Sequence, residues 1–210
     1  LSKLNLLGEV YNKYSLDESI IKYHNNKKLN KKIVLPKKFE RVNIEIGFGN
    51  GEFLIKNALS FPKELFIGIE VYLNGIVKVL TTILDLKLEN IILSNLNSIY
   101  FLEAMMYRSV DKIFIINPDP WVKKRHNKRR LISFEIIQLL TKLIKSENSI
   151  YITTDSEPYL DYMNNLIIQH ENFLGFHNIK ILSENDKLYG ISRYQRKAIR
   201  KGGKIYQLTL

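Results

Sequence analysis

The sequence EIGFGNGEF, residues 45 to 53, places three glycines and two glutamates directly after an apolar run. Glycines such as Gly47 and Gly49 let a backbone turn tightly and approach a ligand that a Cβ would obstruct. A dinucleotide-binding loop follows the pattern Gly-x-Gly-x-x-Gly, but Glu52 stands where the third glycine belongs. Because that carboxylate would repel a pyrophosphate, the loop favours a ligand without phosphates.

Two further carboxylates indicate what such a ligand carries. Glu45 stands just before the loop and suits an amino group. Glu70 lies about 20 residues beyond the loop, where an acid can bind both hydroxyls of a ribose. A ribose with an ammonium group and no phosphates describes S-adenosylmethionine. The alternative interpretation is a structural glycine turn flanked by solvated acids.

The sequence NPDPW, residues 117 to 121, predicts a rigid corner around Asp119. The two prolines fix φ on either side of this aspartate and remove two backbone donors. Aligning a nucleophile with a methyl sulfonium is mainly a problem of orientation, to which well-placed groups can contribute ~7 to 11 kcal/mol. Trp121 could stack on a nucleobase, but a single tryptophan is more often part of a core, so we interpret it as packing the corner.

A dense basic run follows the corner directly. Six of the eight residues from Lys123 to Arg130 are lysine or arginine. In a helix, like charges four residues apart would each cost ~0.2 to 0.5 kcal/mol, a cost that a polyanion would relieve. A solvated face or a nuclear localisation signal are the alternatives. Beside a corner of nucleobase size, however, the run indicates that phosphates are bound while a base reaches the corner.

The bulk composition agrees with a nucleic-acid partner. The chain has 210 residues, a net charge of +11 and no cysteine, which excludes disulfides, thiolate metal sites and cysteine nucleophiles. Its positive charge is clustered in three segments, of which the last has seven basic residues and no acid; they are 22–41, 123–130 and 187–210. The four histidines show no metal-site spacing, and we expect no metal. Without a signal-peptide pattern or an apolar run of membrane length, we expect a cytoplasmic protein.

Short apolar runs alternate with amphipathic stretches of helix length, a pattern that predicts a doubly wound α/β sheet. Predicted buried strands span residues 42–46, 65–70, 90–94, 112–116 and 149–154. Predicted helices span residues 52–60, 75–86, 98–107, 133–144 and 156–170. We predict a final pair of strands over residues 177–182 and 203–210. We expect one domain over residues 42–210, preceded by a basic leader over residues 1–41.

Every candidate motif follows one of these strands. The glycine loop, Glu70, Asn97, the NPDPW corner and the sequence TTDSEPY (153–159) each follow a different predicted strand. Ligands of doubly wound sheets bind beyond the carboxyl ends of the strands. Five motifs at one edge therefore predict a single cleft.

The stretches EIGFGNGEFL, FIGIEV, NPDPWVKKRHNKRRL, TTDSEPY and SRYQRKAIRKGGKIYQL resemble, in order and spacing, the tRNA (guanine-N7-)-methyltransferase family. The similarity covers roughly residues 40–210. It implies a Rossmann-like class I methyltransferase with a seven-stranded sheet, mostly parallel with an antiparallel C-terminal strand. It also implies transfer of a methyl group from S-adenosyl-L-methionine to N7 of a guanine in the tRNA variable loop. No obligatory partner subunit is evident in the sequence, and we expect a monomer or homodimer.

The resemblance also implies roles for individual residues. Asp119 matches the catalytic residue. The cofactor-binding positions are Glu45, Gly47, Gly49, Glu70, Asn97 and Asp119. The substrate-binding positions are Lys123, Asp155, Ser192, Arg193, Tyr194 and Gln195. The RNA-contacting positions are Arg125, His126, Asn127, Lys128, Arg129 and Arg130.

One departure concerns the family's Thr-x-Phe-Glu motif, which is Ser-Arg-Tyr-Gln at residues 192 to 195. Gln195 can accept a hydrogen bond from guanine but brings no charge. Because guanine N7 already carries a lone pair, Asp119 need not act as a base; we expect it to orient the reactants and favour the positive charge that develops. Asp155 is expected to accept from guanine N1 and N2, and Lys123 to bind a phosphate or a base acceptor.

Three other functions are consistent with parts of the pattern. NPDPW is distantly similar to the Asn-Pro-Pro-Tyr corner of N6-adenine methyltransferases, although Asp119 separates its prolines. A non-catalytic RNA-binding protein would also use the basic segments, but it would not need Glu45, Glu70 and Asp119. A nicotinamide oxidoreductase is disfavoured by Glu52.

Overall fold

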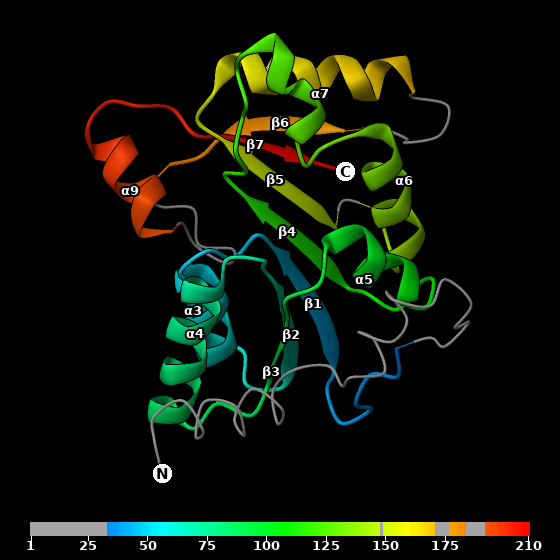
Figure 1. Ribbon diagram of the computed structural model, residues 1–210, viewed down its shortest axis with the longest axis vertical. Coiled ribbons are helices and arrows are strands. Elements are labelled where there is room, and N and C mark those ends of the chain that lie inside the picture. Colours follow the sequence, from blue (N-terminus) through cyan, green and yellow to red (C-terminus); the bar gives the residue numbers. More distant parts are fainter. Residues whose placement is uncertain (1–32, 148, 171–176, 184–191) are drawn as a thin grey trace.

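The apolar runs form a single seven-stranded sheet (Figure 1). The structure is a computed structural model that describes residues 33–147, 149–170, 177–183 and 192–210, so residues 1–32 of the predicted leader lie outside it. The sheet order is β3-β2-β1-β4-β5-β7-β6. The strands are β1 (Arg41–Ile46), β2 (Glu64–Ile69), β3 (Ile91–Ser94), β4 (Lys112–Ile116), β5 (Ile150–Thr154), β6 (Asn178–Ile181) and β7 (Tyr206–Thr209).

Strands β1 to β5 pair in parallel, whereas β7 runs antiparallel to both β5 and β6. This arrangement confirms the predicted fold class, including the antiparallel C-terminal strand. The central strands are buried on both faces, as expected when helices cover a parallel sheet from both sides, although the second face of β1 carries the polar residues Asn43 and Glu45. In the register of β1 and β2, Ile44 lies opposite Ile67, and both are fully buried.

Helices pack on both faces of the sheet (Figure 1). On one face, Leu54 of α3 and Val79 of α4 form a core with Phe66 of β2. On the other, helices α5, α6 and α7 contribute side chains to the core that contains Ile44 and Ile67. The helices are α3 (Glu52–Ser60), α4 (Leu73–Leu86), α5 (Ser98–Ala104), α6 (Phe134–Leu143), α7 (Glu157–Gln169) and α9 (Arg193–Arg200), with a 3₁₀ helix η1 (Lys124–Arg129).

Three helices and strand β7 differ from the sequence-based predictions by two residues or more, and β7 begins at Tyr206 rather than residue 203. Helix α4 begins at Leu73 rather than residue 75, and α5 ends at Ala104 rather than residue 107. Helix α9 was not predicted, because its sequence RYQRKAIR lacks an apolar period of helical type. A capping box starts it instead: Ser192 Oγ accepts from the Gln195 N–H at 3.2 Å, and Gln195 Oε1 accepts from the Ser192 N–H at 2.9 Å.

The described part of the chain also bears on membrane and metal binding. None of its helices combines the length and the apolar character that a membrane span requires. Within the same residues, no cluster of histidine, aspartate and glutamate side chains forms a metal-binding group.

Candidate active site

The glycine loop after β1 is open where a ligand would approach it. Gly47 and Gly49 have φ values of 75° and 53°, in the left-handed region that favours glycine. A Cβ added to either would have no heavy atom within 4 Å among the described residues, so both glycines border open space. At Gly75 the opposite holds, because a Cβ there would lie 2.1 Å from the carbonyl oxygen of Gly49. Gly75 therefore lets α4 pack against the loop, a role that the sequence did not reveal.

Glu45 is a buried carboxyl group at the end of β1. Its side chain is 4% exposed, and Oε2 has no hydrogen-bond partner in the part of the chain that the structure describes. Burial, with a smaller contribution from the nearby Glu70 carboxylate, raises the pKa of Glu45 from 4.5 to about 8. A cation placed beside this group would favour its ionised form and give the oxygen a partner.

Glu70, at the end of β2, is hydrogen-bonded to the backbone around it. Its Oε2 accepts from the Gly49 N–H at 2.8 Å, and its Oε1 accepts from the N–H groups of Val71 and Tyr72 at 2.8 and 2.9 Å. These bonds fix the glycine loop relative to β2. A carboxylate offers about four acceptor sites, so binding two ribose hydroxyls would require at least one of the three bonds to open.

Asn97 follows β3 and begins α5. Its Oδ1 accepts from the Ile99 N–H at 2.9 Å, which caps the helix, and the residue is exposed. Since β3, β2 and β1 are neighbours in the sheet, Asn97, Glu70 and Glu45 line consecutive strand ends. Carboxylates, an amide and an open glycine turn suit a ligand with an ammonium group and hydroxyls, as S-adenosylmethionine has.

The NPDPW corner is held by Arg130 and leaves Asp119 exposed at its tip. Arg130 Nε donates to the carbonyl oxygen of Pro120 at 3.0 Å, and Nη2 donates to that of Trp121 at 3.5 Å. The same guanidinium lies over the ring of Tyr162 on α7, 4.4 Å from its centre. Sequence reasoning assigned Arg130 to RNA contact and missed these bonds, which fasten the corner to α7.

Trp121 packs against the basic run, in agreement with the interpretation from sequence. Trp121 is half-buried. The centre of the His126 ring lies 5.5 Å from the centre of the Trp121 ring, nearly perpendicular to it, and the guanidinium of Arg129 lies 5.0 Å from that centre. The backbone of Trp121 has a φ of 40°, a conformation that is rare for a large side chain. The turn from the corner into η1 therefore depends on these packed side chains.

Most of the basic run's side chains that the structure describes are exposed. Lys123, which precedes η1, is exposed. The exposed predicted RNA-contacting residues are Arg125, Asn127, Lys128 and Arg129, whereas His126 and Arg130 are half-buried. In a 3₁₀ helix side chains three residues apart lie on the same side, so Arg125 and Lys128 share one side of the turn and Arg129 lies about 120° from them.

Gln195 of α9 joins three segments of the site. It is 1% exposed, and its Nε2 donates to Asn117 Oδ1 and to Thr153 Oγ1, each at 2.8 Å. Thr153 Oγ1 in turn donates to Asn117 Oδ1 at 2.8 Å. With Oε1 accepting from Ser192, both polar atoms of the amide are engaged inside the protein. The predicted substrate-binding role needs one of them free, whereas these contacts position α9 against the corner.

Asp155 and Tyr194, two predicted substrate-binding residues, are brought together across the site. The Tyr194 hydroxyl donates to Asp155 Oδ2 at 2.6 Å, and both side chains are exposed. This hydrogen bond is the main reason that the pKa of Tyr194 is raised. Arg193 is also exposed, and Ser192 caps α9 through its hydroxyl.

Asn117 and Thr153 are the site residues that sequence reasoning did not assign. Both belong to quoted motifs, at the ends of the neighbouring strands β4 and β5, where buried polar residues are a recognisable signal. Asn117 has a φ of 48°, which asparagine tolerates better than most residues. The hydrogen-bonded group of Asn117, Thr153 and Gln195 therefore supports the backbone two residues before Asp119.

We expect Gln195→Met to lower the free energy of unfolding by about 2 to 4 kcal/mol. The change keeps the side-chain volume but removes three hydrogen bonds in a buried place, where each unsatisfied group costs ~1 to 3 kcal/mol. Urea unfolding measures the effect. Gln169→Met, at an exposed position of α7, is the matched control and should change stability by less than about 0.5 kcal/mol. Equal stability of the two variants would contradict a positioning role for Gln195.

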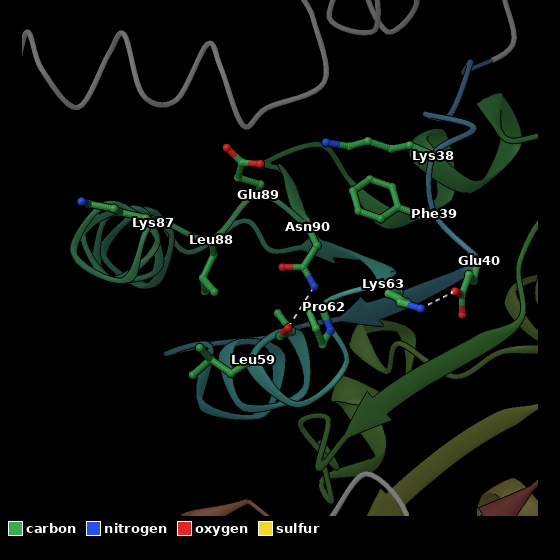
Figure 2. A pocket seen from close by; sticks show the side chains of 11 residues that line it. Lys38, Phe39, Glu40, Leu59, Pro62, Lys63, Lys87, Leu88, Glu89 and Asn90 are labelled. Carbon is green, nitrogen blue, oxygen red and sulfur yellow. Dashed lines mark hydrogen bonds and ion pairs between the residues drawn. The ribbon is translucent and has the colours of Figure 1, made fainter.

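A cavity of about 640 Å³ lies at the opposite edge of the sheet (Figure 2). It is lined by residues that precede β1, β2 and β3, among them Lys38, Lys63 and Asn90. Asn90 donates to the carbonyl oxygens of Ala58 at 2.9 Å and Glu64 at 3.0 Å. Its amide therefore connects the residues before β3 to α3 and to the start of β2. None of the predicted site residues lines this cavity.

Known proteins are similar to this chain in sequence and in fold. A family model described as "Putative methyltransferase" matches residues 40–208. A solved structure of a 30S ribosomal methyltransferase from an uncultured bacterium has a TM-score of 0.52 and 20% identity, covering 82% of this chain and 87% of its own. At that identity the likeness concerns the fold alone.

Two curated relatives are more similar in sequence. A tRNA (guanine-N(7)-)-methyltransferase from Wolbachia pipientis wMel is 37% identical over 196 residues, which cover 92% of this chain and 85% of that protein. A protein of the same name from Buchnera aphidicola subsp. Schizaphis graminum (strain Sg) is 36% identical over 169 residues, covering 80% and 70%. With the fold, the glycine loop and the NPDPW corner in place, the chain belongs to the tRNA (guanine-N7-)-methyltransferase family.

Proposed function

We propose that this protein transfers a methyl group from S-adenosyl-L-methionine to N7 of a guanine in the variable loop of tRNA, giving 7-methylguanosine. The observation that carries the proposal is the 37% identity to a relative of that name over 92% of this chain. Two groups of side chains at the carboxyl edge of the sheet support the proposal. The group at the ends of β1, β2 and β3 suits the methyl donor, and the group at the ends of β4 and β5 suits a nucleobase.

The donor would be held at the ends of β1, β2 and β3. S-adenosyl-L-methionine supplies an electrophilic methyl group on a sulfonium. Glu45 would bind its ammonium, and Glu70 and Asn97 would bind its nucleoside part. Gly47 and Gly49 leave the space that a Cβ would fill. These carboxylates have no phosphate to repel, which distinguishes the site from a dinucleotide site.

The base would be held at the ends of β4 and β5. Because guanine N7 has an in-plane lone pair, no residue has to remove a proton before attack. Asp119 would orient the base and favour the positive charge that the purine acquires. Asp155 keeps acceptor sites beside its bond to Tyr194 and would accept from guanine N1 and N2. Lys123 is placed to bind a phosphate or a base acceptor.

The phosphates of the tRNA would be bound next to this corner. The exposed side chains Arg125, Lys128 and Arg129 provide positive charge, and His126 and Asn127 provide hydrogen bonds. RNA contact by Arg130 stays a prediction, since its guanidinium already binds the corner. We further propose a cytoplasmic monomer or homodimer with no obligatory partner subunit, built as one domain over residues 42–210 with a basic leader over 1–41.

The function is tested by giving the purified protein S-adenosyl-L-methionine labelled in the methyl group together with bulk tRNA. We expect label in tRNA and 7-methylguanosine as the labelled nucleoside after digestion. The control is tRNA in which guanosine is replaced by 7-deazaguanosine, which lacks the N7 nucleophile. Label in another nucleoside, or equal labelling of the 7-deaza tRNA, would contradict the assignment of the methylated atom.

A further inference from the structure

Helix α9 carries a dense positive charge that the proposed roles do not use. Arg196, Lys197, Arg200 and Lys201 are all exposed on the helix and its C-cap. No acidic residue occurs between Ser192 and the last residue of the sequence. The helix therefore has a strongly basic outer surface.

This surface is unfavourable for the isolated helix. Arg193 and Lys197 are four residues apart, as are Arg196 and Arg200, and such like-charge pairs each cost ~0.2 to 0.5 kcal/mol. Arg193 also stands at the N-terminal end of the helix, where the helix dipole disfavours a cation. An external polyanion would relieve both effects.

The opposite side of α9 is anchored to the protein. Ala198 and Ile199 pack against the buried side chains of Leu182 and Ile205. Gln195 is buried and hydrogen-bonded to Asn117 and Thr153. The basic side chains therefore face solvent from a helix whose position is fixed.

The anchor places α9 at the same corner as η1. Asn117, which binds Gln195, lies two residues before Asp119, and Arg130 at the end of η1 binds the carbonyl oxygen of Pro120. Helix α9 is thus hydrogen-bonded to residue 117 of the corner, and the end of η1 to residue 120. An RNA whose target base lies at Asp119 would pass both.

We propose that α9 is a second surface for the tRNA backbone, on which Arg196, Lys197, Arg200 and Lys201 bind phosphates beyond those bound by η1. This inference rests on the proposed function. Phosphate contacts fix the register of a nucleic acid without reading its sequence, so α9 would help place the target guanine at the corner.

The experiment compares three double variants, each with two charges removed. Arg196→Gln with Lys197→Gln tests α9, and Arg125→Gln with Lys128→Gln tests η1. The third, Lys63→Gln with Lys87→Gln, removes two exposed lysines at the opposite edge of the sheet, outside the three basic segments (Figure 2). Dissociation constants for tRNA are measured between about 50 and 200 mM salt, where phosphate contacts change affinity most visibly.

For the α9 variant we expect a dissociation constant for tRNA raised about tenfold, and a salt dependence shallower by roughly one to two units. The KM for tRNA should rise while kcat at saturating tRNA and the affinity for S-adenosyl-L-methionine stay unchanged. The η1 variant should weaken binding similarly, and the control variant should bind like the unmodified protein.

Two outcomes would overturn the role of α9. One is an α9 variant with the affinity and salt dependence of the unmodified protein while the η1 variant is weakened; the proposed function would then stand without this surface. The other is a control variant that weakens tRNA binding as much as the α9 variant does. The weaker binding would then result from the lower net charge alone. If the unmodified protein neither bound nor methylated tRNA, the proposed function itself would fail.

Discussion

Replacing Asp119 by asparagine is expected to lower the rate of methyl transfer by roughly 10² to 10³-fold, the usual cost of losing a preorganised electrostatic group. Asparagine keeps the shape of the side chain and removes its negative charge. The corner should remain in place, because Pro118, Pro120 and Arg130 hold its backbone independently of this carboxylate. The loss should therefore appear in the chemical step.

Single-turnover rates at saturating S-adenosyl-L-methionine and tRNA measure this effect. Asp85→Asn, at an exposed position of α4, is the matched control and should react like the unmodified protein. The tRNA affinity of the Asp119→Asn variant should change little, since the phosphate contacts lie elsewhere. A rate near that of the unmodified protein would show that the charge of Asp119 is not needed.

The affinity for S-adenosyl-L-methionine should rise with pH, by up to about tenfold per unit below pH 8 and less steeply as pH 8 is reached. In the free protein the pKa of Glu45 is raised to about 8, so the carboxyl group is mostly protonated at neutral pH. An ammonium beside it favours the ionised form, so binding lowers this pKa and releases a proton. Above about pH 8 the carboxylate is already formed and the dependence should end.

Calorimetry in two buffers of different ionisation enthalpy measures the released proton directly. Glu45→Gln should bind more weakly at pH 8 and without proton release, whereas Glu89→Gln, at the opposite edge, should match the unmodified protein. Constant affinity of the unmodified protein from pH 6 to 9 would contradict an ammonium at Glu45. Without cofactor, stability should fall as pH rises from about 4.5 toward 8, because only the unfolded chain ionises Glu45 freely.

The sheet could be predicted because its strands have a simple local signal. Buried parallel strands such as β1 and β4 are short runs rich in isoleucine and valine, and the motifs that follow them mark the carboxyl edge. The same reasoning placed Glu45, Glu70 and Asp119 at that edge. The order β5-β7-β6 could not be predicted, because the sequence of an antiparallel strand does not show which strands lie beside it.

The contacts that hold the site could not be predicted from local pattern. Gln195 and Asn117 are 78 residues apart in sequence, and only tertiary packing brings them together. Arg130 shares a run with five other basic residues, so its distinct position beside Pro120 has no local signature. For Gln195 and Arg130 the resemblance implied interaction with a ligand, while the structure engages the side chain within the protein.

The sheet order has a consequence for the time at which a growing chain becomes active. Strand β7 lies between β5 and β6, so β6 leaves the ribosome before the strand that connects it to the sheet. A nascent chain that has reached the end of α7 already contains β1 to β5 and Asp119, but it lacks Gln195 and the bonds to Asn117 and Thr153. Synthesis of α9, which precedes β7, therefore supplies the last of these bonds, and chains released earlier would hold the backbone around Asp119 by the two prolines and Arg130 alone.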